Sequence, residues 1–272
     1  MAYKKIPQYL FLILLAIFAL LPFYIMLKGS FEPYRHIVSS KFTFWPLEPS
    51  FSNYKDVIFN YQFVRWFINS SVVTITAIGA NLILDTLAAF ALARIRFAGN
   101  TFVFMLLLAT LIIPIQVIVI PLYFLLMKLN WIDSYYGLIV PVIMSPFGIF
   151  YLRQSFFQIP IELDEAALID GAGYLGILFR IIVPNSLAAL GTMAVLKFMW
   201  VWGDFLLPSL IVTRDRLLTL PVGIATFQRG GGTVPWNLVM PASVLTVLPV
   251  VILFLFLQRY FIQGLTDGAV KE

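Results

Sequence analysis

Six long apolar runs divide the chain, and shorter polar stretches separate them. A helix needs roughly 20 residues to cross the ~30 Å hydrocarbon core of a bilayer, and each run reaches or approaches that length. The pattern predicts an all-α integral membrane protein with six transmembrane helices in one transmembrane domain, residues 1–272. The predicted spans are residues 8–27, 66–93, 101–127, 134–152, 185–213 and 237–257.

Charged residues and prolines interrupt several of these runs. A proline removes one backbone hydrogen bond from a helix, and neighbouring helices must cover the gap. Two interpretations stay open: the prolines allow kinked packing, or they act as hinges in a protein that moves between two states. The charged positions are Asp85, Lys197 and Asp204, and the prolines are Pro22, Pro114, Pro121, Pro141 and Pro249.

Composition supports the membrane assignment and excludes several chemistries. Hydrophobic residues make up 61% of the chain and charged residues 11%, with a mean hydropathy of +0.95; soluble domains are about 25% charged. Cysteine is absent and His36 is the single histidine, which excludes thiolate chemistry and multi-histidine metal sites. No Gly-Lys dipeptide occurs, so the phosphate-binding loop of ATPases is missing. The net charge of +5 suits an anionic membrane surface, and without a basic cluster it gives no support for nucleic acid.

Charge alone does not orient the chain. Six spans place both termini on one side, and lysines and arginines divide almost equally between the two sides. Lys4, Lys5, Arg94 and Arg96 lie close to helix ends and favour cytoplasmic termini. On the other side, residues 29–65 form a long aromatic segment of mixed charge, which we expect to be folded and able to meet a partner.

Residues 153–184 are too polar to span the membrane and have the pattern of short helices. Pro160 suits the first helical position, acidic residues fill the first turn, and Gly171 supplies a natural end. A second short helix, residues 175–182, ends at Pro184. Periodicity alone favours an ordinary amphipathic surface helix, but two alanines on one face also permit close approach of a soluble partner. That face contains Leu163, Ala166, Ala167 and Asp170.

The residue order in this loop resembles a known family. Residues 165–172 read EAALIDGA and residues 181–184 read IIVP, which is similar to the EAA loop of bacterial binding-protein-dependent ABC importers. Further segments resemble the carbohydrate-uptake permeases similar to the MalG subunit of the maltose system, so the resemblance covers essentially the whole chain. These segments are residues 69–70 (NS), 87–94 (LAAFALAR), 153–154 (RQ), 202–205 (WGDF), 220–223 (LPVG), 256–259 (FLQR) and 264–271 (GLTDGAVK).

The resemblance implies a non-catalytic permease subunit in the bacterial cytoplasmic membrane, multi-pass, with both termini cytoplasmic. The implied partners are a second related permease, two ATPase subunits and an extracytoplasmic solute-binding protein, within the lipid bilayer and without nucleic acid. ATP and Mg²⁺ are then expected on the ATPase subunits, and no cofactor on this chain. Residues 153–184 become a coupling loop seated in a cleft of the ATPase. Its implied contact residues are Glu165, Ala166, Ala167, Asp170, Gly171 and Ala172.

Asp85 and Lys197 lie inside spans, where an unpaired charge costs about 2.5–3.5 kcal/mol. Measured from the cytoplasmic ends of their helices, they lie about 12 Å and about 18 Å deep. A lysine side chain bridges that difference if the two helices touch. We therefore expect an Asp85–Lys197 ion pair that holds two helices in register.

Other polar and aromatic residues in the spans are candidates for a translocation path. Indole rings stack on sugar rings, and carboxylates accept hydrogen bonds from sugar hydroxyls. The same residues also suit structural functions, as an interfacial aromatic belt or as hydrogen bonds between helices. The candidates are Asn81, Gln116, Trp200, Trp202 and Asp204.

Two other classes of protein fit the sequence less well. A self-sufficient secondary transporter usually has more spans, two matching halves and a chain of intramembrane carboxylates. A membrane enzyme requires a cluster of His, Glu or Cys near one interface, which this sequence lacks. Relatives of the subfamily also carry polyols or glycerol phosphate. Because Lys197 is the one basic residue within the spans, the sequence favours a neutral carbohydrate, with those solutes as the alternative.

Overall fold

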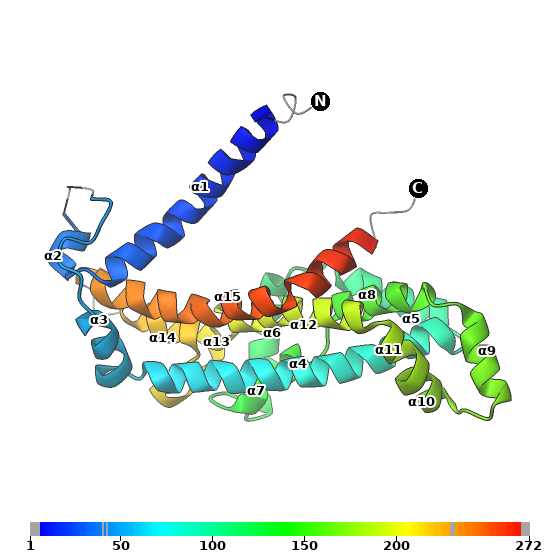
Figure 1. The fold of residues 1–272 in the computed structure, drawn as a ribbon. Coiled ribbons are helices and arrows are strands. Elements are labelled where there is room, and N and C mark those ends of the chain that lie inside the picture. Colours follow the sequence, from blue (N-terminus) through cyan, green and yellow to red (C-terminus); the bar gives the residue numbers. More distant parts are fainter. Residues whose placement is uncertain (1–5, 40, 42, 229–231, 268–272) are drawn as a thin grey trace. The chain divides into compact units, whose positions relative to one another are not determined.

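The computed structural model describes residues 6–39, 41, 43–228 and 232–267, with the backbone alone at 257 and 259–267. The described residues form helices joined by turns and contain no strand (Figure 1), so the predicted all-α class is confirmed. Five helices are long and apolar enough to cross a membrane, and a sixth span results if one bent pair counts as one. The spans are α1 (Ile6–Ser30), α4 (Phe63–Arg94), the α5–α6 pair (Asn100–Thr110 and Ile115–Lys128), Tyr135–Phe157, Leu187–Ile211 and Trp236–Phe256, the first part of α15 (Trp236–Asp267).

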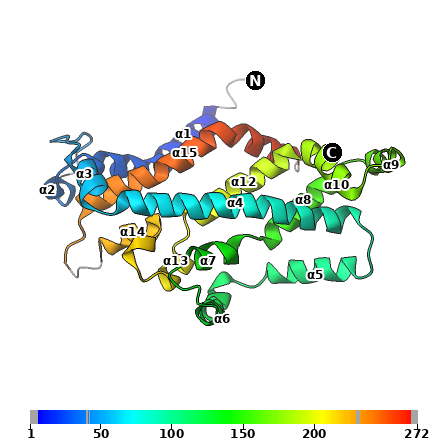
Figure 2. The same cartoon turned by 90° about the horizontal axis from the view of Figure 1, so that it is seen from below.

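The third predicted span is not one straight helix. Its two halves, α5 and α6, meet at 100°, and in Figure 2 α5 runs across the picture while α6 is seen end-on. Pro114 caps α6 with an extended backbone (ψ 138°), which no helical residue adopts. The predicted run 101–127 was correct in composition and wrong in shape, because hydropathy carries no information about a bend.

The fourth and fifth predicted spans are interrupted helices. Tyr135–Phe157 comprises α7 (Tyr135–Ile139), a 3₁₀ turn η3 (Val140–Val142) and α8 (Pro146–Phe157), so the helix extends five residues beyond the predicted end at Leu152. Leu187–Ile211 comprises α12 (Leu187–Trp202) and α13 (Leu206–Ile211). Helix α12 ends at its C-cap residue, Gly203.

The chain divides into two compact units, and the single domain expected from the sequence stays a prediction. Unit 1 comprises Met1–Phe67 and Leu220–Pro249. Its core contains Trp66, whose ring lies so close to Gly223 that any side chain there would collide with it. Besides α1 and parts of α4 and α15, unit 1 contains α2 (Tyr34–Ile37), α3 (Ser52–Lys55), the π-helical η2 (Asp56–Asn60) and α14 (Leu220–Thr226).

Unit 2 comprises Ile68–Thr219 and Val250–Glu272. Its hydrophobic core joins α4, α8 and α12 to the loop between α8 and α12, and Leu152, Phe156, Leu178 and Ile182 are fully buried there. This core therefore supports the polar loop directly. The loop contains α9 (Ile161–Ile169), α10 (Tyr174–Ile177), the π-helical η4 (Leu178–Ile182) and α11 (Val183–Asn185), and a 3₁₀ turn η5 (Asp215–Leu217) follows α13.

Candidate functional site

Helix α9 begins with the signals that the sequence contains. Pro160, predicted to be the first helical residue, is instead the N-cap with ψ 134°, and α9 begins one residue later at Ile161. Because proline has no N–H, this position costs the helix no hydrogen bond. Glu162 and Asp164 lie in the first turn, where the helix dipole favours negative charge.

The C-terminal end of α9 is a Schellman turn. Gly171 has φ +81°, a left-handed conformation that glycine adopts without strain. Its N–H donates to the carbonyl of Leu168 (3.0 Å), and the N–H of Ala172 donates to the carbonyl of Ala167 (2.9 Å). These two bonds satisfy carbonyls that otherwise lack helical partners. The predicted stop at Gly171 is confirmed.

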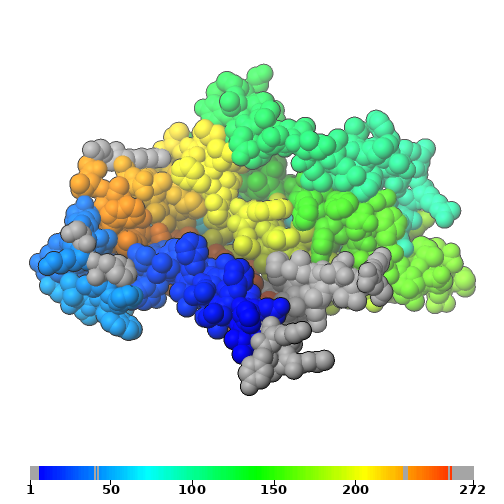
Figure 3. All heavy atoms as spheres, turned by 90° about the horizontal axis from the view of Figure 1, so that it is seen from above, coloured from blue at the N-terminus to red at the C-terminus, as the bar shows by residue number. Residues whose placement is uncertain are grey.

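Most of α9 presents its side chains to the outside. Of the six predicted contact residues, Glu165, Ala166, Asp170 and Gly171 are exposed, and Ala167 and Ala172 are half-buried against the core. In Figure 3 the green atoms of this segment lie at the outer edge of unit 2. Large apolar side chains share the exposure: Ile169 is 87% exposed, and Leu163, Leu168, Leu175 and Phe179 are also exposed. An uncovered apolar patch with acidic margins is typical of a protein interaction surface.

The second helical segment of the loop is longer than predicted. Helical backbone begins at Tyr174, passes through the π-helical turn η4 and ends at Asn185, so Pro184 lies within α11 and does not terminate the helix. Pro184 is tolerated because it occupies the first turn of α11, where its missing N–H leaves little unpaired. Ile177, Leu178 and Ile182 anchor this segment in the unit 2 core.

Asp164 makes an ion pair that the sequence did not predict. Its carboxylate Oδ2 lies 3.0 Å from Nε of Arg94, and the two side chains are 7% and 5% exposed. Burial raises the pKa of the Asp164 carboxyl, and the positive charge of Arg94 opposes that rise. Glu165, one residue later, points away because each residue turns a helix by about 100°. The ion pair was hidden because Arg94 lies 70 residues earlier in the chain.

Asp85 occupies a polar site inside unit 2. Its Oδ2 accepts a hydrogen bond from Asn81 Nδ2 (2.9 Å), and its Oδ1 accepts one from the backbone N–H of Ser145 (3.0 Å), the N-cap of α8. Gly148 makes room for this carboxylate, since a side chain there would collide with it. Lys197 is buried nearby at 5% exposure. The two charges attract each other, but they do not form an ion pair within 4.0 Å, so the predicted direct pair stays a prediction.

The five candidate path residues have different surroundings. Asn81 is 1% exposed and Trp202 4% exposed, and the Trp202 ring stacks on Phe198. Asp204 is half-buried, and its Oδ1 accepts a hydrogen bond from the N–H of Leu206 at the start of α13. Gln116 and Trp200 are exposed in the single chain. Of the five, these two present the most surface to a passing solute.

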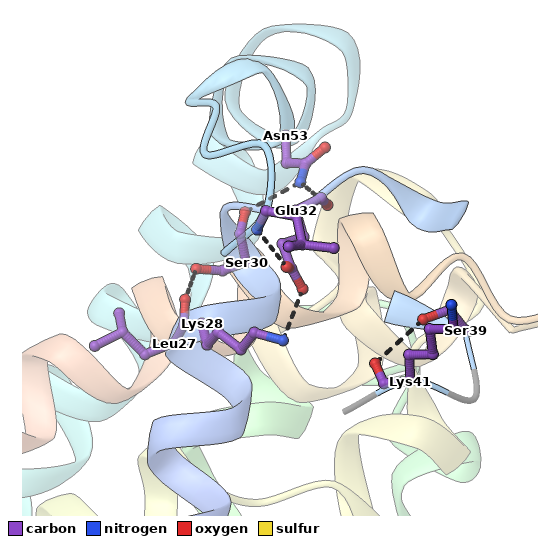
Figure 4. A network of polar contacts seen from close by, with 8 residues as sticks. Leu27, Lys28, Ser30, Glu32, Ser39, Lys41 and Asn53 are labelled. Atoms are coloured by element: carbon purple, nitrogen blue, oxygen red, sulfur yellow. Dashed lines mark hydrogen bonds and ion pairs between the residues drawn. The ribbon is translucent and has the colours of Figure 1, made fainter. Parts of the chain in front are cut away.

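A polar network folds the segment between α1 and α4, as the sequence predicted. Glu32, 1% exposed, pairs with Lys28 (3.2 Å) and accepts a hydrogen bond from the N–H of Leu47 (3.0 Å). Asn53 Nδ2 donates to the carbonyls of Ser30 and Glu32 (Figure 4). The network leaves Trp45 78% exposed. A folded segment with an exposed indole suits contact with an external partner.

The described residues form five or six helices of membrane-spanning length and an exposed helical loop, and they contain no group of three or more His, Asp or Glu side chains placed to hold a metal. These features are those of a multi-pass membrane protein, and the family match supplies its class. Residues 85–267 match the family described as binding-protein-dependent transport system inner membrane component, and the chain belongs to this family. It is a non-catalytic inner-membrane permease of an ABC importer.

Curated relatives match nearly the full length. The arabinooligosaccharides transport system permease protein AraQ of Bacillus subtilis is 34% identical over 98% of this chain and 96% of its own length. The trehalose/maltose transport system permease protein MalG of Thermococcus litoralis is 35% identical over 98% and 97%. The fold is also similar to a bacterial ABC transporter involved in the import of the acidic polysaccharide alginate, with a TM-score of 0.84, 22% identity and coverage of 96% and 97% of the two chains.

Proposed function

We propose that this permease imports a carbohydrate delivered by an extracytoplasmic solute-binding protein and is driven by ATPase subunits docked on its coupling loop, residues 153–184. A second related permease completes the translocation path. Two ATPase subunits bind ATP and Mg²⁺ on the cytoplasmic side, where both termini of this chain lie. The family match, which names binding-protein-dependent transport, supports the requirement for an external binding protein.

The exposed surface of α9 is the observation that carries this proposal. Nine residues of helix expose nearly every side chain, including the 87% exposed Ile169, although the loop is firmly anchored in the core. Ala166 permits close approach of another surface. Glu165 and Asp170 offer charge-assisted hydrogen bonds to a partner. When two ATPases close on ATP, pressure on α9 would move the helix bundle between inward-open and outward-open states.

Similarity to carbohydrate permeases supports the class of solute. The relatives in Bacillus subtilis and Thermococcus litoralis are named for arabinooligosaccharides and for trehalose and maltose. A relative in Brucella abortus, 30% identical, is named for sn-glycerol 3-phosphate. Lys197, the basic residue deep in a span, is buried and close to the charge of Asp85. A neutral carbohydrate therefore suits this chain better than a phosphate ester, and exposed Trp200 supplies a ring on which sugars stack.

Co-purification from native membranes tests the docking surface. The tagged chain is purified as wild type and as Glu165→Lys, and attached proteins are identified by mass spectrometry. We expect the wild type to bring an ATPase and a second permease. Glu165→Lys should reduce the bound ATPase by about tenfold or more, because it places a like or unpaired charge in a desolvated contact. The second permease should remain, since α9 is not within the membrane.

Asp215→Lys is the matched control, an equal charge reversal at an exposed residue of η5. It should retain both partners. A Glu165→Lys chain that keeps its ATPase would contradict docking on α9. A wild-type chain that purifies alone and moves solute into vesicles without ATP would replace the proposal with a self-sufficient secondary transporter.

A further inference from the structure

Arg94 joins two membrane helices where they end. It is the last residue of α4, and its Nη2 donates to the carbonyls of Phe156 (2.8 Å) and Ile159 (2.7 Å) at the end of α8. The last carbonyls of a helix have no partner within the helix and carry partial negative charge. The guanidinium therefore caps α8 from the side of α4.

The same guanidinium also holds α9. Its Nε lies 3.0 Å from Asp164 Oδ2. One planar group on α4 therefore contacts both the end of α8 and α9. Asp164 is the one buried residue of α9 in the described chain. Besides its covalent ends and the packing of Ala167 on the core, α9 is thus attached to the membrane helices through this ion pair.

Helices α4 and α8 have a second connection that does not involve α9. Arg153 Nε donates to the carbonyl of Leu92 (3.1 Å), and its guanidinium lies over the rings of Phe104 and Phe157. Loss of the Arg94–Asp164 pair should therefore loosen α9 while α4 and α8 remain joined.

We propose that the Arg94–Asp164 ion pair is the joint that transmits movement of α9, the exposed helix of the coupling loop, to α4 and α8. This inference rests on the proposed docking of an ATPase on α9. Arg94 and Asp164 are positioning residues: neither contacts ATP or solute, and together they make α9 and the cytoplasmic end of α4 move as one body.

A distance measurement in the wild-type complex tests the joint directly. The natural chain has no cysteine, so spin labels can be attached at Arg96→Cys and Glu162→Cys, two exposed positions that line one open groove between the end of α4 and α9. The purified complex with its ATPases is measured without nucleotide and with ATP and EDTA. A rigid joint predicts the same label distance in both states. A change of more than about 2 Å in the wild type overturns the inference.

Neutral variants test the same point through transport. We expect Arg94→Gln and Asp164→Asn to retain their ATPases and to hydrolyse ATP in liposomes. Import of radiolabelled maltose or arabinotriose per ATP should fall about tenfold, and the double variant should be no worse than either single one. In Asp164→Asn the label distance should also change with nucleotide. Arg96→Gln removes a charge from an exposed position two residues beyond Arg94, outside α9, and should behave as wild type.

The outcomes separate the two proposals. If no ATPase accompanies the wild type, the proposed function fails. If ATPases bind and drive import but the pair variants keep the wild-type ratio and label distance, only the joint is wrong. If a pair variant does not assemble, the wild-type distance decides, because it requires no substitution at the pair.

Discussion

Adjacent residues in α9 have opposite surroundings because of helix geometry alone. Asp164 faces the membrane helices and is buried, while Glu165 faces outward. The sequence identified both as acids of a first turn, and the resemblance identified Glu165 as a contact residue. The sequence could not predict the ion pair between Asp164 and Arg94, because periodicity shows which residues share a helix face but not which element packs against that face.

Asp85 and Lys197 illustrate the same limit inside the membrane. Their presence in spans indicated mutual neutralisation, yet Asp85 is stabilised by Asn81 and by the N-terminus of α8. The helix is interrupted before α8, and this leaves the N–H of Ser145 without a helical partner and able to donate to Asp85. Hydropathy did not predict that interruption, because the run as a whole is apolar. Lys197 has no hydrogen bond or ion pair among the described contacts and depends on the nearby charge of Asp85.

These surroundings predict an order of stability. Asp85→Asn should destabilise the permease by about 3 kcal/mol, because it leaves the Lys197 ammonium buried without an opposite charge. Lys197→Met should cost less, since Asp85 retains two hydrogen-bond donors. The double variant Asp85→Asn with Lys197→Met should recover most of the loss. Thermal unfolding of the detergent-solubilised complex measures the order, and a double variant that assembles worse than both single variants would argue against charge compensation.

At the scale of elements, the ends of α9 were well predicted and the spans less so. Pro160 and Gly171 act locally, through a missing N–H and a positive φ, so residue type alone locates them within one position. The bend between α5 and α6 and the breaks before α8 and after α12 depend on neighbouring helices. Pro114 indicated an irregularity, but nothing in the run distinguished a slight kink from a 100° turn.

The Schellman turn gives a matched pair of substitutions. Gly171 has φ +81°, whereas Gly173 has φ −78°, and a side chain would meet no atom within 4 Å at either. Gly171→Ala should therefore destabilise the end of α9 by about 1 kcal/mol through backbone strain alone, and Gly173→Ala should be nearly neutral. Affinity of the purified ATPase for the permease measures the effect. Equal losses in both variants would show that the turn geometry does not matter.

At the scale of the whole molecule, the resemblance was more informative than any single residue. Short motifs spread along the chain predicted the family, and relatives about 34% identical across its length confirm it. The motif at residues 264–271 extends beyond the described residues, so the structure does not test its last positions. The solute-facing surface remains the least predictable part, because in the proposed assembly the path forms between this chain and a second permease.

A transport panel tests the class of solute. Vesicles containing the full importer and its binding protein receive labelled maltose, arabinotriose, glycerol or sn-glycerol 3-phosphate with ATP. We expect uptake of a neutral sugar to exceed that of the phosphate ester by about tenfold or more, because Lys197, the basic residue deep in a described span, is buried and near the charge of Asp85. Vesicles without the binding protein are the control. Preferential uptake of sn-glycerol 3-phosphate or glycerol would replace the carbohydrate assignment.

The bend in the third span makes this part of the permease sensitive to the thickness of the bilayer. Helix α5 has 11 residues and α6 has 14, lengths of about 16 Å and about 21 Å. Neither matches a hydrocarbon core of about 30 Å, whereas the unbroken α1 does. One permease therefore presents full-length and half-length apolar elements to the same lipids. Acyl-chain length and sterol content, which set membrane thickness, would then bias the angle between α5 and α6, quite apart from nucleotide or sugar.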